Sequence, residues 1–279
     1  VVLKKLHLPI DKQPKLLVWN QFLTKFKNPK HTVEIGLIGK YVELKDAYKS
    51  ITEAFIHAGA QNQIKVKINW IHSEDLTVTN VPRKLKNLNG ILVAPGFGGR
   101  GIEGKIDTVR YVRENNIPFL GICLVMQRAA IEFAQNVCGL KNAESDERNM
   151  KNCIPWITTM ESQKAKIKTG DMGGSMRLGS YDAVLKKGTL ARKIYGSDII
   201  SERHRHRYEL NPEYVETLEQ HGMIISGTSP NGLLPEIIEL DTKTHPFFIA
   251  VQFHPELQAR PLTSHKLFNV FVVASTKKK

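Results

Sequence analysis

The chain has 279 residues, 41% of them hydrophobic and 24% charged, and a formal net charge of +13. This proportion of apolar residues builds a sizeable core, which excludes a disordered or fibrous chain. No stretch approaches the roughly 20 consecutive apolar residues of a membrane span, so we expect a cytoplasmic protein. Three cysteines without a Cys-x-x-Cys pair exclude a disulfide framework, and we expect no metal site.

Much of the positive charge lies at the two ends of the chain. Residues 1–30 hold seven lysines and one acid, Asp11, and the sequence ends with three more lysines. A nucleic-acid surface would instead combine arginines with interleaved aromatic residues, so we interpret the ends as solvated tails. We expect residues 1–30 to be an interdomain linker, 31–276 a single domain and 277–279 a lysine tail. The start at Val1 indicates a fragment or a processed chain.

The N-terminal half alternates between predicted helices and strands. The linker contains one amphipathic helix around Leu16–Phe26. Later segments follow in the order strand Val33–Ile38, helix Asp46–Ala58 ending at Gly59, strand Ile64–Ile71, strand Ile91–Ala94, helix Ile102–Glu114, strand Pro118–Ile122 and helix Leu124–Val137. Strands that alternate with helices at this spacing predict a parallel sheet with helices on both faces.

From about Ile154 the pattern changes to shorter strands separated by turns. The expected elements are Ser180–Leu185, Gly222–Ser226, Leu234–Leu240, Phe247–Phe253 and a last helix near Leu262–Ala274. The sequence therefore predicts an α/β fold. Its mainly parallel central sheet is flanked by helices, and a smaller strand-rich section lies in the C-terminal half.

Cys123 lies at the junction between a predicted strand and a predicted helix. Side chains at such a turn project from the carboxyl edge of the sheet, where ligands bind in open α/β folds. The helix N-terminus there favours the thiolate, which is the nucleophilic form of cysteine. The alternative is a small buried hydrophobic residue, and this segment alone does not decide between the two.

A histidine and a glutamate near the C-terminus favour the nucleophile. His254 and Glu256 lie two residues apart after the apolar strand, so in an extended segment both side chains point to the same side. The carboxylate can then orient the imidazole, and the imidazole can hold Cys123 as thiolate and protonate a leaving amine. On its own, a histidine before a proline is usually structural.

These segments resemble a known family. The motifs 121–127, Gly-Ile-Cys-Leu-x-Met-Gln, and 252–256, Gln-Phe-His-Pro-Glu, are similar to those of class I glutamine amidotransferases. In that family a cysteine, a histidine and a glutamate hydrolyse glutamine to glutamate and ammonia through a thioester. Segments 39–41, 96–104, 172–179 and 202–209 resemble the glutaminase domains of the CTP synthase branch. The resemblance covers residues from about 33 to the C-terminus.

The resemblance implies roles for further residues. Cys123, His254 and Glu256 are the implied catalytic triad, and the backbone amides of Gly96 and Leu124 are the implied oxyanion hole. The implied glutamine-binding residues are Gly96, Gln127, Glu147, Arg207 and Tyr208. The alternative for Gly96 is a merely structural glycine turn. Without the family, we would interpret the arginine-histidine run 203–207 as a solvated basic face.

The resemblance also implies a larger enzyme with an allosteric effector. Phe97, Arg177 and Leu178 are candidates for binding GTP, an activator, and residues 164–179 for a mobile lid. The expected partners are glutamine, GTP and a synthetase domain that converts UTP to CTP with ATP and Mg²⁺, in a homotetramer. No cofactor is expected in this chain, which lacks a Gly-x-x-x-x-Gly-Lys-Ser/Thr phosphate loop.

Val125 departs from the family, which usually has glycine two residues after the nucleophile. A β-branched residue there is expected to tilt the helix, narrow the glutamine pocket or shift the Leu124 amide. Displacements on the order of 1 Å in a catalytic site cost about 100-fold in rate. Two alternatives therefore stay open: an attenuated or inactive glutamine-binding or assembly module, and the glutaminase of another biosynthetic amidotransferase.

Overall fold

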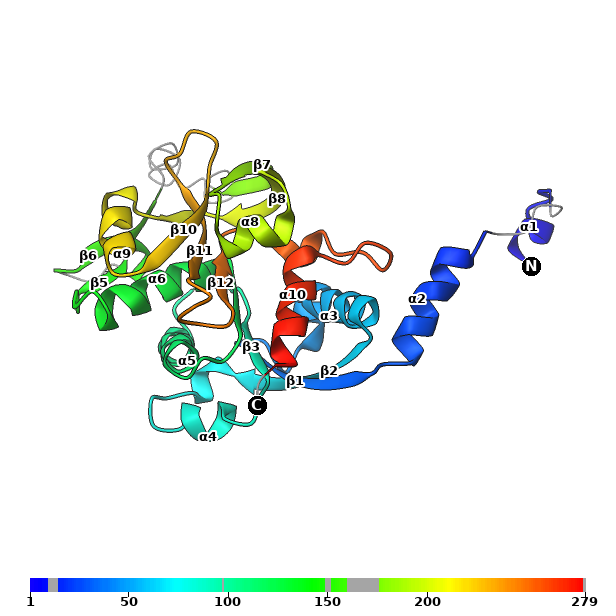
Figure 1. Ribbon diagram of the computed structural model, residues 1–279, viewed down its shortest axis with the longest axis horizontal. Coiled ribbons are helices and arrows are strands. Elements are labelled where there is room, and N and C mark those ends of the chain that lie inside the picture. Colours follow the sequence, from blue (N-terminus) through cyan, green and yellow to red (C-terminus); the bar gives the residue numbers. More distant parts are fainter. Residues whose placement is uncertain (10–14, 97, 149–151, 160–175, 278–279) are drawn as a thin grey trace.

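The computed structural model describes residues 1–9, 15–96, 98–148, 152–159 and 176–277. A nine-stranded sheet forms the centre of the molecule, with helices on both faces (Figure 1). Five neighbouring strands pair in parallel, in the order β2 (Ile64–His72), β1 (His31–Gly39), β3 (Gly90–Val93), β4 (Phe119–Ile122) and β12 (Phe248–Val251).

The other half of the sheet is antiparallel. It continues from β12 through β11 (Pro235–Leu240), β10 (Met223–Thr228), β7 (Arg177–Leu185) and β8 (Ile199–His206). A separate three-stranded sheet contains β5 (Ala143–Ser145), β6 (Ile154–Thr159) and β9 (Tyr208–Leu210). The predicted α/β fold is confirmed, but the large sheet is mixed, because most of the C-terminal strands extend it instead of forming a section of their own.

Two apolar cores lie on opposite faces of the sheet. One contains residues of α4 (Val81–Leu85), α5 (Ile102–Glu114), α6 (Leu124–Asn136) and α9 (Val215–Gln220). The other contains residues of α3 (Lys49–Asn62), α8 (Leu190–Tyr195) and α10 (Lys266–Ser275). The central strands are buried on both faces, which is why they consist of nearly continuous apolar runs.

The helix that we expected to end at Gly59 continues through Asn62. A Cβ atom on Gly59 would lie 2.6 Å from the carbonyl oxygen of Ile64, so the glycine allows α3 to pass close to the start of β2. The helix ends instead at Gln63, which adopts the left-handed conformation with φ of 53°.

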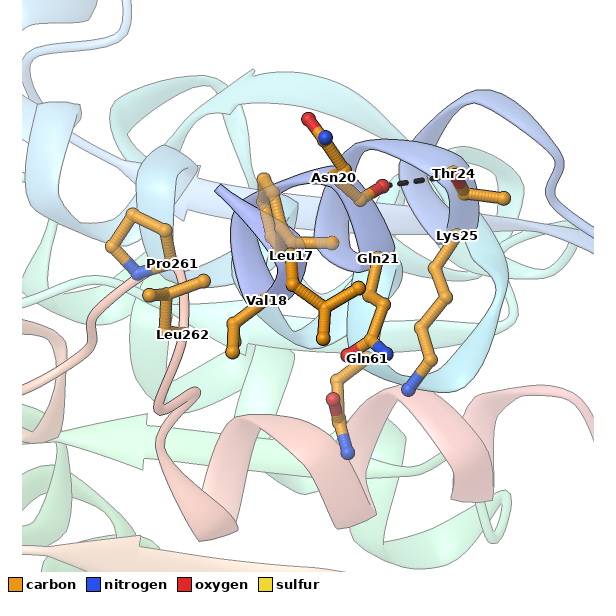
Figure 2. A pocket seen from close by; sticks show the side chains of 10 residues that line it. Leu17, Val18, Asn20, Gln21, Thr24, Lys25, Gln61, Pro261 and Leu262 are labelled. Atoms are coloured by element: carbon orange, nitrogen blue, oxygen red, sulfur yellow. Dashed lines mark hydrogen bonds between the residues drawn. The ribbon is translucent and has the colours of Figure 1, made fainter. Parts of the chain in front are cut away.

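The predicted linker helix is present as α2 (Leu17–Lys27), and the short α1 (Val2–Lys5) stands away from the body (Figure 1). None of the α2 residues is buried. Between α2, the end of α3 and Pro261–Leu262 lies an open groove of about 530 Å³ (Figure 2). Its lining holds no carboxylate, histidine or cysteine.

No helix among the described residues is long and apolar enough to cross a membrane. The limits of the linker, the domain and the tail stay predictions, and residues 278–279 of the tail lie outside the described residues.

Val125 lies in the first turn of α6 and is fully buried in the core that α6 shares with α4, α5 and α9. A Cβ atom on Gly121 would lie 3.0 Å from Val125 Cγ1, so the valine packs against the glycine of β4. The space that a larger residue needs at position 125 is therefore provided by the missing side chain at position 121.

We expect Val125→Gly to lower the free energy of unfolding by about 2–4 kcal/mol. The reason is the loss of a buried side chain together with the cost of glycine within a helix. Urea denaturation measures the change. Ile56→Gly provides the control, because Ile56 lies on helix α3 but is 39% exposed, so it should cost less. Equal losses for the two variants would contradict the packing role of Val125.

Candidate active site

Cys123 lies on a strained turn between β4 and α6. Its φ of 58° and ψ of −111° are rare for a residue with a side chain, and such backbone costs on the order of 1–3 kcal/mol. Its amide donates a 2.7 Å hydrogen bond to the carbonyl of Val251, at the end of the neighbouring strand β12. Cys123 is also the N-cap residue of α6, so its sulfur lies next to the positive end of the helix dipole.

His254 comes three residues after the end of β12 and lies on the same edge of the sheet as Cys123. Its Nδ1–H donates a 2.7 Å hydrogen bond to Oε1 of Glu256, and both side chains are buried. Burial disfavours the charged imidazole, but the Cys123 thiolate and the Glu256 carboxylate outweigh it and raise the pKa of His254 to about 11. The arrangement therefore stabilises an imidazolium beside the thiolate.

A narrow cavity joins these groups to most of the other predicted site residues. It is lined by Pro95, Gly96, Cys123, Leu124, Gln127, Glu147, His206, Arg207, Tyr208 and His254. Among the predicted catalytic, oxyanion-hole and glutamine-binding residues, Glu256 alone does not line it, and this residue is hydrogen-bonded to His254. Val125 does not line the cavity either, so its side chain does not narrow it.

Two polar side chains in this cavity are held by neighbours. Gln127 donates from Nε2 to the Tyr208 carbonyl at 2.8 Å and to Gln252 Oε1 at 3.1 Å, which leaves its own carbonyl oxygen buried without a partner among the described residues. Glu147 accepts a 3.3 Å hydrogen bond from Arg128, a fully buried arginine. The cavity therefore presents an oriented acceptor and a fixed carboxylate to a polar ligand.

Arg177 and Leu178, the two candidate effector residues that the structure describes, do not line this cavity. Phe97 and residues 164–175 of the expected lid lie outside the described residues. Residues 177–179 belong to strand β7 and not to a loop, because they pair with β8 in antiparallel register. The Leu178 side chain is 60% exposed, whereas Arg177 is buried.

Arg177 joins two buried carboxylates behind the cavity. It donates to Glu236 Oε1 at 2.6 Å and lies 3.5 Å from Glu209 Oε1. Burial raises the pKa of Glu236 to about 7, although the Arg177 charge opposes this, and burial together with the Glu236 charge raises the pKa of Glu209 well above its usual range. One positive charge, that of Arg177, thus lies next to two carboxyl groups. This favours a proton shared by Glu236 and Glu209 near neutral pH.

The histidines of β8 complete this cluster and belong to the part of the site that the sequence reasoning missed. His204 and His206 are buried, and a 2.8 Å hydrogen bond connects Nδ1 of His204 with Nε2 of His206. Burial and the Arg177 charge lower their pKa values to about 2 and about 3, so both rings are neutral. Alternate residues of the 202–207 run point inward, and this period of two was the available signal for a strand.

We expect the Glu236→Gln variant to lose part of the pH dependence of stability. A carboxyl whose folded pKa is about 7 binds a proton in the folded state that the unfolded state releases near its ordinary pKa of 4.5. The free energy of unfolding of the parent chain should therefore fall as pH rises from 4.5 to 7, by on the order of 3 kcal/mol from this group.

Urea unfolding at pH 5 and pH 8 measures this fall in both proteins. The exposed control Glu213→Gln should keep the full slope. A Glu236→Gln slope as steep as that of the parent chain would contradict the buried, protonated carboxyl.

Comparisons with known proteins agree with this geometry. The family described as glutamine amidotransferase class-I matches residues 43–274. The chain is 57% identical over 279 residues to the CTP synthase of Flavobacterium psychrophilum, covering all of this chain and 51% of that protein. It is 53% identical over 281 residues to the CTP synthase of Methanocaldococcus jannaschii, covering 99% of this chain and 51% of that protein.

A solved structure is similar over most of its length. The glutaminase domain of Trypanosoma brucei CTPS, with bound acivicin, superposes with a TM-score of 0.81 at 36% identity, covering 88% of this chain and 95% of that one. The chain spans about half the length of the curated relatives it matches. It therefore belongs to the class I glutamine amidotransferases, in the branch formed by the glutaminase domains of CTP synthases.

Proposed function

We propose that this chain hydrolyses glutamine to glutamate and ammonia with Cys123 as the nucleophile. The observation that carries the proposal is the single cavity that gathers Cys123, His254, Gly96 and Leu124, with Glu256 bonded behind the histidine. These are a nucleophile, an acid-base group with its orienting carboxylate, and two backbone donors, as acyl transfer requires.

In the first half of the reaction the Cys123 thiolate attacks the side-chain carbonyl carbon of glutamine. The oxygen gains negative charge, which the amides of Gly96 and Leu124 stabilise; Leu124 is the first residue of α6, where amides have no partner within the helix. The His254 imidazolium gives its proton to the leaving nitrogen, the C–N bond breaks, and ammonia departs from a thioester.

In the second half a water molecule replaces ammonia. Neutral His254 takes a proton from the water, and the oxygen attacks the thioester carbon. When the C–S bond breaks, the thiolate is restored beside an imidazolium and glutamate leaves. Glu256 bonds to Nδ1 of His254 and so keeps the other ring nitrogen, Nε2, directed at the reacting atoms.

The same cavity accounts for recognition of the amino-acid end of glutamine. In this proposal Glu147 pairs with the α-ammonium group and Arg207 with the α-carboxylate, because each provides the opposite charge. Gln127 and Tyr208 line the cavity between them. The binding of acivicin by the trypanosomal domain supports the assignment of this cavity as the ligand site.

We further propose that the ammonia serves a synthetase domain that uses ATP and Mg²⁺ to convert UTP to CTP in a tetrameric enzyme. Support comes from the relatives named CTP synthase, of which this chain matches about half. Those names favour neither an inactive module nor another biosynthetic amidotransferase. GTP activation through Phe97, Arg177 and Leu178 is part of this proposal, with Leu178 as its exposed described residue.

Removal of the nucleophile should abolish ammonia release. We expect Cys123→Ala to lower kcat by at least about 1000-fold and Glu256→Gln by on the order of 100-fold or more, since the latter loses the bond that orients His254. Ammonia formation from glutamine, with and without a synthetase half, ATP, UTP and GTP, measures both. Cys138→Ala is the matched thiol control and should retain full activity. Equal rates for Cys123→Ala and the parent chain would refute the mechanism.

Substrate recognition is tested through Glu147→Gln. Loss of the carboxylate charge should raise KM for glutamine by about 10–100-fold with little change in kcat, because an ion pair to the substrate ammonium is worth roughly 1.5–3 kcal/mol. Steady-state kinetics and acivicin inhibition report the effect, with the exposed Glu213→Gln as control. An unchanged KM would place the ammonium elsewhere.

A further inference from the structure

Lys105 is a lysine whose side chain is enclosed in the protein interior. It lies in the first turns of α5 and is only 1% exposed. Its Nζ donates a 2.9 Å hydrogen bond to the carbonyl oxygen of Ala94. Lysine is almost never fully buried unless its charge is paired, and this side chain forms no ion pair with a carboxylate among the described residues.

The carbonyl that Lys105 holds belongs to the peptide leading into the active-site loop. Ala94 follows β3, and its own amide donates a 2.8 Å hydrogen bond to Ile38 of β1. The next two residues, Pro95 and Gly96, line the cavity beside Cys123. Proline has no amide hydrogen and a fixed φ, so the Ala94 peptide largely sets the direction in which Gly96 enters the site.

The charges around Lys105 come from three elements. Burial lowers the pKa of Lys105 to about 7, and the cations Lys40, at the end of β1, and Arg128, on α6, lower it further. The Cys123 thiolate acts in the opposite direction and favours the charged amine. Cys123 thus favours the charged form of Lys105, although its effect is smaller than those of burial and of the two cations.

We propose that Lys105 is a positioning residue for glutamine hydrolysis, whose ammonium fixes the Ala94 carbonyl, and with it the Gly96 amide, and whose charge supports the Cys123 thiolate. The role in positioning the Gly96 amide rests on the proposed function, because it concerns glutamine hydrolysis. The effect of the Lys105 charge on the Cys123 thiolate concerns the sulfur alone and is measurable without turnover. A lysine that only filled space would affect neither the amide nor the thiolate.

Two variants separate the hydrogen bond from the charge. Lys105→Met removes both but keeps an unbranched side chain of similar length, whereas Lys105→Gln keeps a donor without charge. Arg110→Met, a half-exposed cation on the same helix α5, is the matched control. Each variant of the 279-residue chain is assayed for glutaminase kcat and KM, for the pH dependence of iodoacetamide alkylation at Cys123, and for thermal unfolding. Cys123→Ala gives the background from the other two thiols.

For Lys105→Met we expect kcat to fall by about 10–100-fold, with KM changed by less than about threefold, because a displaced oxyanion donor acts on the transition state. The midpoint of the alkylation profile should move to higher pH by about half to one unit. Lys105→Gln should recover part of kcat but keep the shifted profile, and Arg110→Met should match the parent chain.

Parent values of kcat and of the alkylation midpoint in Lys105→Met would overturn the proposal. A fall in kcat that is proportional to the loss of folded protein, without a shifted alkylation profile, would also overturn the proposal. It would show that Lys105 contributes to stability alone. If Lys105→Met does not fold, Lys105→Gln decides by the same alkylation shift. If the parent chain releases no ammonia, the proposed function fails, but a shifted alkylation profile still supports the pairing of Lys105 with the thiolate.

Discussion

The parallel pairing of β4 with β12 is the constraint on which the active site depends. These strands are far apart in the sequence, yet Ile122 lies opposite Val251, and the next amide, that of Cys123, donates to the Val251 carbonyl. Cys123, the proposed nucleophile, and the segment carrying His254 therefore leave the sheet side by side at its carboxyl edge. Cys123 has a positive φ of 58° with a ψ of −111°, and the buried sheet around it offsets the cost of this strained turn.

The interior beside this edge holds many polar and charged side chains, and most of them lie next to a partner. The Glu256 carboxylate bonds to His254 near Cys123, helix α6 begins at Cys123, and Lys105 bonds to the Ala94 carbonyl that leads into the cavity. Behind the cavity, Arg177 serves two carboxylates that share one compensating cation, with two neutral histidines beside them. Burying such groups costs stability, and the well-packed cores on both sheet faces offset it.

Sequence patterns predicted the parallel half of the fold closely. The helix over 102–114 and the strand before Cys123 are present at the expected positions, because continuous apolar runs and helical periodicity are strong local signals. The β8 strand was missed because its alternation is between buried histidines and exposed arginines, so no hydrophobic contrast marks it. Val125 was a concern from the sequence alone, but Gly121 in the neighbouring strand makes room for it.

The chain by itself determined the chemistry: a cysteine at a strand-to-helix turn, a histidine and glutamate two residues apart, and motifs similar to those of one family. Local spacing fixes such relations, because side-chain direction in a strand or at a helix start repeats with a known period. Only the tertiary structure decided which distant groups line the cavity, including His206 and Pro95, and that Lys105 bonds to the Ala94 carbonyl before it. It also decided that Arg177 faces inward, because a side chain's partners and pKa depend on what the fold packs against it and not on its neighbours in the sequence.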